Sequence, residues 1–166
     1  MFKVNDYVAY NSTGVYKIID IRKEKDTGNN DIEYYVLEPA YNNNMIIKTP
    51  VNNPKVLMRN IMTKEDVLSL IANMPETETI WTDDDRYRNQ SFKAALRTGQ
   101  SEEWVKIIKT LYLVKKGKLN VGKKLMKTDE DIMKAAERNL HEEFAMALHI
   151  SPDEVLPYIL DHVQVN

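Results

Sequence analysis

The residues best suited to binding or chemistry gather in one polar segment, residues 79–88, which reads TIWTDDDRYR. The segment places Trp81, one of two tryptophans in the chain, ahead of three consecutive aspartates and two arginines. No apolar periodicity surrounds it, so the pattern does not indicate a buried helix or strand. A large aromatic side chain in such a place needs either burial or a binding partner. Two interpretations of Trp81 therefore stay open: an anchor in the core or between domains, and a surface residue that contacts a ligand.

Carboxylates and histidines raise the question of a metal site. Residues 83–85 are all aspartate and could bind a divalent cation, but three consecutive side chains point in different directions, so a helix start or a loop is favoured. The HEE sequence at residues 141–143 lacks a partner, because the next histidine, His149, is eight residues from His141 and a helical zinc pair needs a spacing of four. Glu137 and His141 share a helix face, which alone is a weak metal signal.

Other catalytic signatures are missing from the sequence. The five glycines are scattered and form no phosphate loop, there is no cysteine, and no Gly-x-Ser-x-Gly turn is present. We therefore expect no enzyme, no cofactor and no metal, and we keep a hydrolase or metal enzyme as a minor alternative. The lack of cysteine suits a reducing cytoplasm. The N-terminus lacks a signal-peptide pattern and no window approaches a membrane span, so we expect a cytoplasmic protein without membrane contact.

Lysines are concentrated in one window, although the chain as a whole carries a net charge of -2. Residues 104–127 contain eight lysines and no acid, whereas acids gather in residues 76–85 and 129–143. One interpretation of the window is a solvated helical face. The other is a phosphate-binding surface, because clustered lysines attract a polyanion without reading its sequence. The eight are Lys106, Lys109, Lys115, Lys116, Lys118, Lys123, Lys124 and Lys127.

The first part of the chain, residues 1–60, reads as short strands. The segments DYVAY, GVYKIIDIRKE, IEYYVLEP and MIIKTP are rich in β-branched and apolar residues, and turns containing Asn, Gly or Pro separate them. About four or five strands at this spacing predict a small antiparallel barrel of the Tudor-like or SH3-like kind.

From Thr63 onward the apolar pattern changes to the period of helices. Thr63 and the acids after it can cap a first helix, and Gly99 stands at a C-cap position. Trp104 belongs to a series of apolar residues at helical spacing, which predicts that it lies in the core. Further helices are expected to begin at Ser101, Thr128 and Ser151-Pro152. The predicted fold class is α+β, with a barrel over residues 1–60 and an α-helical bundle over residues 63–166.

Two series of segments carry a family resemblance. The first is FKVNDYVAYNSTGVYKIIDI, EYYVLEP and MIIKTPVNN, with Arg59 close behind. The second is a tryptophan followed by Arg-x-Arg, then ALRTGQSEEWVKIIKTLY, KKGKLNVGKKLM and AAERNLHEEFAMAL. In this order and spacing the chain resembles the CarD family of bacterial transcription regulators, which bind RNA polymerase. Each motif is loose, but their series is fairly specific and covers nearly the whole chain.

The resemblance implies a role for the predicted barrel. In the family this module, shared with the transcription-repair coupling factor, docks on a lobe of the polymerase β subunit. We expect the contact to be an exposed strand edge that pairs with the partner, with lysines adding charge complementarity. The expected polymerase-binding residues are Lys23, Met45, Ile46, Ile47, Lys48 and Thr49.

The resemblance also implies that the helical bundle contacts promoter DNA at the upstream edge of the opening bubble. Trp81 would wedge into the minor groove there, which trades unstacking, on the order of a few kcal/mol per base step, for protein contact. Arg86 and Arg88 would hold neighbouring phosphates. Lys123 and Lys124 would add attraction that does not depend on DNA sequence. The expected function is stabilisation of the open promoter complex.

The main alternative is an interaction module that binds polymerase or another protein and makes little use of DNA. The net negative charge and the aspartates at residues 83–85 favour it, because acids repel phosphates. We expect a monomer whose partners are the polymerase β subunit and promoter DNA.

Overall fold

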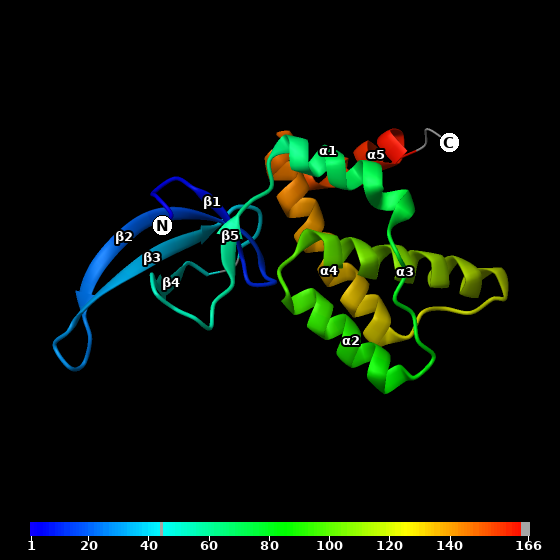
Figure 1. Cartoon of the computed structure of the whole chain (residues 1–166), viewed down its shortest axis with the longest axis horizontal. Coiled ribbons are helices and arrows are strands. Elements are labelled where there is room, and N and C mark those ends of the chain that lie inside the picture. Colours follow the sequence, from blue (N-terminus) through cyan, green and yellow to red (C-terminus); the bar gives the residue numbers. More distant parts are fainter. Residues whose placement is uncertain (44, 164–166) are drawn as a thin grey trace. The chain divides into compact units, whose positions relative to one another are not determined.

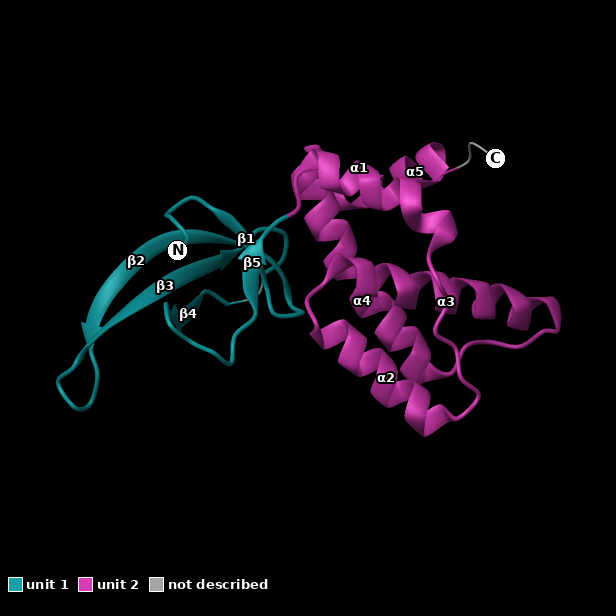
Figure 2. Ribbon diagram, viewed as in Figure 1, with its two compact units in different colours: residues 1–61 teal, residues 62–166 magenta. Residues whose placement is uncertain are grey.

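The computed structural model describes residues 1–43 and 45–163. The chain divides into two compact units, residues 1–61 and residues 62–166 (Figure 2). The first unit contains strands and the second contains helices, so the predicted α+β class is confirmed. Within the described ranges, no helix has both the length and the apolar composition that crossing a membrane requires.

An antiparallel sheet forms the first unit (Figure 1). The order of its strands is β4-β3-β2-β1-β5, so β4 and β5 are the edges and do not pair with each other in the described residues. The sheet is therefore open, and the prediction of a closed barrel is wrong. Closure needs a continuous ladder between the outer strands, and β4 and β5 are only four and three residues long. The strands are β1 (Tyr7–Tyr10), β2 (Gly14–Lys25), β3 (Asp31–Pro39), β4 (Ile47–Pro50) and β5 (Met58–Asn60).

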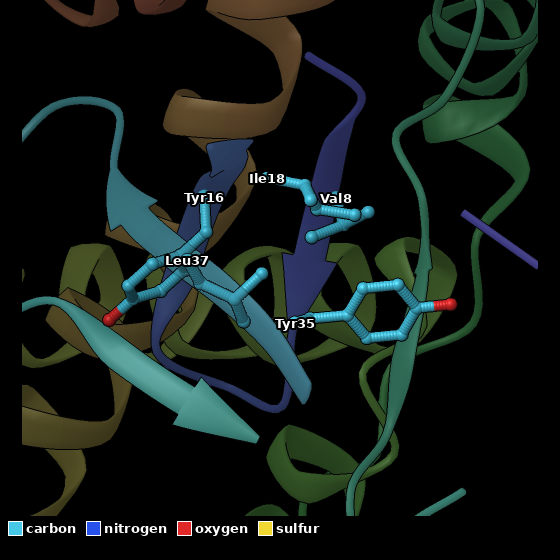
Figure 3. Packing of buried hydrophobic residues seen from close by; sticks show 5 residues of the cluster. All are labelled: Val8, Tyr16, Ile18, Tyr35 and Leu37. Atoms are coloured by element: carbon cyan, nitrogen blue, oxygen red, sulfur yellow. The ribbon is translucent and has the colours of Figure 1, made fainter. Parts of the chain in front are cut away.

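The core of the sheet lies on one of its faces. Val8 from β1, Tyr16 and Ile18 from β2, and Tyr35 and Leu37 from β3 are each at most 2% exposed and gather in one cluster (Figure 3). Successive residues of a strand point to opposite faces. Val36, which lies between Tyr35 and Leu37 in β3, therefore points away from this core.

A bulge changes the phase of β2. Its register with β3 shifts just after Ile18, so Ile18 and Ile21 both pack on the core although they are an odd number of residues apart. Beyond the bulge, Lys23 follows the phase of Ile21 and pairs with Glu33. The bulge thus decides which face of the sheet each basic residue at the end of β2 reaches.

The second unit is a bundle in which α3 and α4 are the longest helices (Figure 1). Its buried side chains include Ile71, Phe92, Ile107 and Phe144, which come from four different helices and are each at most 1% exposed. The helices are α1 (Lys64–Asn73), the short 3-10 helix η1 (Met74–Glu76), α2 (Asp85–Arg97), α3 (Ser101–Asn120), α4 (Lys127–Leu148) and α5 (Pro152–Val163).

Local signals in the sequence set several of these helix ends. The hydroxyl of Thr63 accepts a hydrogen bond from the backbone N–H of Asp66 at 3.1 Å and caps α1, as predicted. Gly99 has a φ of 71°, a conformation that glycine adopts without steric cost, where the chain turns from α2 to α3. Trp104, predicted to lie in the core, is 2% exposed and donates its Nε1–H to the carbonyl of Leu96 at 3.2 Å.

Candidate functional site

Trp81 lies half-buried in the segment between η1 and α2, with its indole held by two neighbours. Its Nε1–H donates to Oδ1 of Asp83 at 3.0 Å. The guanidinium of Arg88 lies over the ring, 4.1 Å from its centroid. A planar cation at this distance is attracted by the ring quadrupole and stacks on its face. One face and the polar edge of the indole are thus engaged by the protein itself.

Arg88 is in turn held from α4. Its Nε and Nη2 donate to the two carboxylate oxygens of Asp129 at 3.3 and 3.0 Å, and the two side chains are 2% and 1% exposed. Its Nη1 donates to the carbonyl of Thr82 at 2.9 Å and pairs with Asp85 at 2.9 Å. Burial lowers the pKa of the Arg88 guanidinium, but hydrogen bonds and charge from Asp129 and Asp85 outweigh burial and raise it. Arg88 is therefore a permanently charged, buried side chain whose guanidinium N–H groups are already bound to protein acceptors.

Each of the three consecutive aspartates has a partner within the protein. Asp83 accepts from the Trp81 indole, and Asp85 pairs with Arg88. Asp84 is the N-cap of α2, because its carboxylate accepts the backbone N–H of Tyr87 at 2.9 Å. The interpretation of this triplet as a helix start is confirmed at Asp84. The acids that are unfavourable beside a DNA contact thus organise the segment around Trp81.

The structure separates the expected DNA-binding residues into two groups. Arg86, in the first turn of α2, and Lys123 and Lys124, in the turn between α3 and α4, are exposed. Arg88 is buried and bound to Asp129, so its guanidinium is not available to a phosphate. The phosphate role expected of Arg88 does not fit this position, which a local sequence pattern could not reveal.

The turn between α3 and α4 reaches the arginine that stacks on the tryptophan. Nη2 of Arg88 contacts Sδ of Met126 at 3.6 Å, and Met126 follows Lys124 by two residues. Figure 1 shows that α2 and α4 begin at the same end of the helical unit. Trp81 and the end of this lysine-containing turn are thus brought together from distant parts of the chain.

Not all eight lysines of the window face solvent. Lys109 donates its Nζ to the carbonyls of Met74, Pro75 and Thr77 at 3.0, 2.9 and 2.7 Å. Its ammonium group therefore caps the carbonyls of η1 and of the residues that flank it, and all three of its N–H bonds are directed to the protein. Two others pair with acids on their own helix, Lys106 with Glu103 and Lys127 with Asp131. The exposed lysines of the window's second half include Lys115, Lys116, Lys123 and Lys124.

The residues expected to bind polymerase lie at one edge of the sheet. Met45 and Ile46, just before β4, are 83% and 57% exposed. Ile47 is half-buried and packs on the sheet core, and Thr49 is buried. Lys48 is exposed, lies 4.9 Å from the centroid of the Tyr34 ring and forms an ion pair with Glu24. The edge therefore presents two exposed apolar side chains beside a lysine that its neighbours hold in place.

Lys23 and Lys48 lie on opposite faces of the sheet. Lys48 pairs with Val36 of β3, whereas Lys23 pairs with Glu33. Residues paired across antiparallel strands share a face, and Val36 and Glu33, an odd number of residues apart, point to opposite faces. The structure thus does not bring together the two basic contacts expected from the sequence.

A separate apolar groove of about 390 Å³ lies among α3, α4, α5 and η1. Glu137 and His141, the pair predicted to share a helix face, both line it, and its other polar residues are Lys109 and Tyr112. Burial raises the pKa of the Glu137 carboxyl and lowers the pKa of the His141 imidazole. In the part of the chain that the structure describes, no group of three or more His, Cys, Asp or Glu side chains could hold a metal ion.

Comparison with known families identifies the first unit. Residues 2–62 match the family model of the CarD-like/TRCF RID domain. The first unit is therefore similar to the CarD-like/TRCF RID domain. No curated protein shows significant similarity to the chain. The RID domain is an RNA-polymerase-interacting domain and not a catalytic one, which supports an RNA polymerase-binding role for the first unit. The match ends at residue 62, the first residue of the helical unit that carries Trp81.

Sequence patterns alone did not indicate the partners that hold these residues. Asp129 belongs by its pattern to the acids that open a helix, and nothing local signals a buried partner 41 residues away. Lys48 of β4 is held by Glu24 of β2 and Tyr34 of β3, so its partners come from two other strands. Such partners are set by strand register and helix packing, which a single sequence does not encode locally.

Proposed function

We propose that the chain is a transcription regulator that binds the polymerase β subunit through its RID domain and promoter DNA through its helical unit. By holding the upstream edge of the bubble, it stabilises the open promoter complex. The proposed DNA contact rests on Trp81, a half-buried indole held by Asp83 and Arg88. Arg88 also contacts Met126 at the end of the lysine-containing turn. An aromatic ring held in place on a unit that also carries the exposed Arg86, Lys123 and Lys124 suits the edge of a DNA bubble.

The polymerase part is assigned to the β4 edge of the sheet. An edge strand can add a strand of a partner by main-chain hydrogen bonds, which depend little on side chains. Met45 and Ile46 supply exposed apolar surface beside it, and Lys48 supplies charge complementarity toward an acidic partner. The partner assigned to this edge is the β subunit.

The wedge acts through a difference between two promoter states. Unstacking a base step costs on the order of a few kcal/mol in a closed duplex and less where the duplex is already opening. Trp81 inserted at that step therefore binds the open complex more tightly than the closed one, and only this difference shifts the equilibrium. Arg86, Lys123 and Lys124 add attraction to phosphates in both states.

The test is the lifetime of the open promoter complex with Trp81→Ala. We expect a shortened lifetime, with binding to polymerase unchanged because the RID domain supplies that contact. Tyr112→Ala is the matched control, since it also removes an exposed aromatic ring from the helical unit, and it should leave the lifetime as it is. An unchanged lifetime with Trp81→Ala would favour the alternative, a polymerase-binding module that makes little use of DNA.

A further inference from the structure

The guanidinium of Arg88 links the segment that carries Trp81 to both α2 and α4, while Thr110 of α3 accepts the backbone N–H of Ile80 at 3.0 Å. The guanidinium of Arg88 stacks on the indole at 4.1 Å and holds the carbonyl of Thr82, the next residue, at 2.9 Å. The same group is anchored on α4 through both oxygens of Asp129. The orientation of the ring thus depends on a carboxylate that belongs to another helix.

We propose that Arg88 and Asp129 form a positioning pair, which orders the Trp81 indole before any DNA is bound. The pair acts through the ring without touching DNA itself, and its role rests on the proposed function of Trp81. A side chain that is already ordered loses less freedom on binding, an advantage of about three- to tenfold in affinity or lifetime. Because Arg88 covers one face of the ring, the pair also selects the opposite face for contact with a base.

The geometry favours positioning over simple stabilisation of the fold. A buried ion pair alone contributes little, since desolvation offsets its attraction. Here Nη1 of Arg88, which does not face Asp129, is directed at the tryptophan segment, to Thr82 and to Asp85. Asp83 holds the indole Nε1 from within the same segment. The contacts of the pair thus converge on the residues around Trp81.

The first experiment measures the mobility of Trp81 in the free protein. Trp104→Phe gives a background in which Trp81 is the only tryptophan, and acrylamide quenching and fluorescence anisotropy then report on it alone. Arg88→Lys keeps the positive charge but loses the planar fork that stacks and binds two oxygens. Asp129→Asn, a second variant of nearly the same shape, removes the charge that holds the fork. Arg97→Lys is the matched control, because Arg97 is exposed in the last turn of the same helix.

We expect Arg88→Lys and Asp129→Asn to raise the quenching constant of Trp81 at least about twofold and to lower its anisotropy, with the helical circular dichroism retained. Arg97→Lys should change neither. Unchanged quenching in both variants would overturn the proposal. Loss of the helical fold in both would overturn it too, because the pair would then serve the fold rather than the tryptophan.

The second experiment measures the open-complex lifetime. Arg88→Lys should shorten it by about three- to tenfold in the parent and have no further effect when combined with Trp81→Ala. Equal shortening in both backgrounds would mean that Arg88 acts on DNA independently of the ring, which contradicts the proposal. If Trp81→Ala leaves the lifetime unchanged while Arg88→Lys still mobilises the indole, the proposed function fails and the positioning pair stands.

Discussion

The carboxylate of Glu143 on α4 accepts a hydrogen bond from the backbone N–H of Met62 at 2.8 Å, across 81 residues of sequence. Its other oxygen accepts from the hydroxyl of Ser101, the first residue of α3, at 2.9 Å. Glu143 is fully buried. One acidic side chain therefore ties the beginning of the helical unit and the start of α3 to its longest helix.

Glu143→Ala should destabilise the helical unit by about 2–4 kcal/mol, because the buried hydroxyl of Ser101 and the partly buried N–H of Met62 lose this acceptor and a cavity remains. Urea denaturation followed by helical circular dichroism measures the change. Glu78→Ala, which removes an exposed carboxylate from the same unit, is the control and should stay within about 0.5 kcal/mol. Equal stability of the two variants would mean that Glu143 does not tie these elements together.

Replacing Lys123 and Lys124 together by glutamate should weaken binding to duplex DNA on all sequences alike. The slope of log affinity against log salt concentration is negative, and removing one phosphate contact makes it less steep by about 0.9, so the slope should become shallower by about 1–2. Fluorescence anisotropy with labelled duplexes at several salt concentrations measures it. The control is Lys3→Glu with Lys55→Glu, an equal charge change at exposed residues of the first unit. A slope that matches this control would rule out a phosphate role for Lys123 and Lys124.

The opposite placement of Lys48 and Lys23 gives a paired test of the polymerase contact. If the partner strand adds to β4, Lys48→Ala should reduce polymerase affinity by about three- to tenfold. Lys23→Ala should change it by less than about twofold, because its side chain leaves the other face of the sheet. Surface plasmon resonance with the full chain and a β-subunit fragment compares them. A larger loss with Lys23→Ala would move the docking surface to the opposite face.

Burial of His141 predicts a loss of stability on mild acidification. Its folded-state pKa is lowered by burial, with the charge of Asp153 opposing this less strongly, so the unfolded chain takes up the proton first. The neutral, buried imidazole therefore costs the folded state no stability above the unfolded pKa of about 6.5. The free energy of unfolding decreases as the pH falls through this value toward the folded-state pKa. His141→Gln should reduce the difference in Tm between pH 7.5 and pH 5.5, whereas His162→Gln, at an exposed position, should leave it. Equal pH dependence in the parent and His141→Gln would contradict this origin.

Local rules predicted the elements well where one side chain controls one helix end or turn. Thr63 caps α1 by a bond to a residue three positions on, and Pro152 begins α5. Gly99 takes the positive φ that its place after α2 suggested. The phase of β2 was not predictable, because the bulge after Ile18 is seen only once β3 is paired with it.

The sequence indicated Trp81 and Arg88 as candidate site residues, but it indicated neither Asp129 nor the arrangement of the three side chains. Trp81 was identified because a tryptophan in a polar segment needs a partner. Its partner in the folded chain is Arg88, seven residues on, which Asp129 holds from α4. Helix packing decides whether Arg88 contacts a phosphate or forms a buried ion pair. The sequence alone is therefore compatible with both roles.

The amine of Lys109 has consequences for chemical reactivity. An ammonium group has three N–H bonds, and the carbonyls of Met74, Pro75 and Thr77 accept from it. An acylating reagent can reach its nitrogen only after these hydrogen bonds open, whereas Lys123 and Lys124 are exposed. The rate at which Lys109 is labelled, relative to those two, therefore reports how often the segment around η1 opens in the native protein.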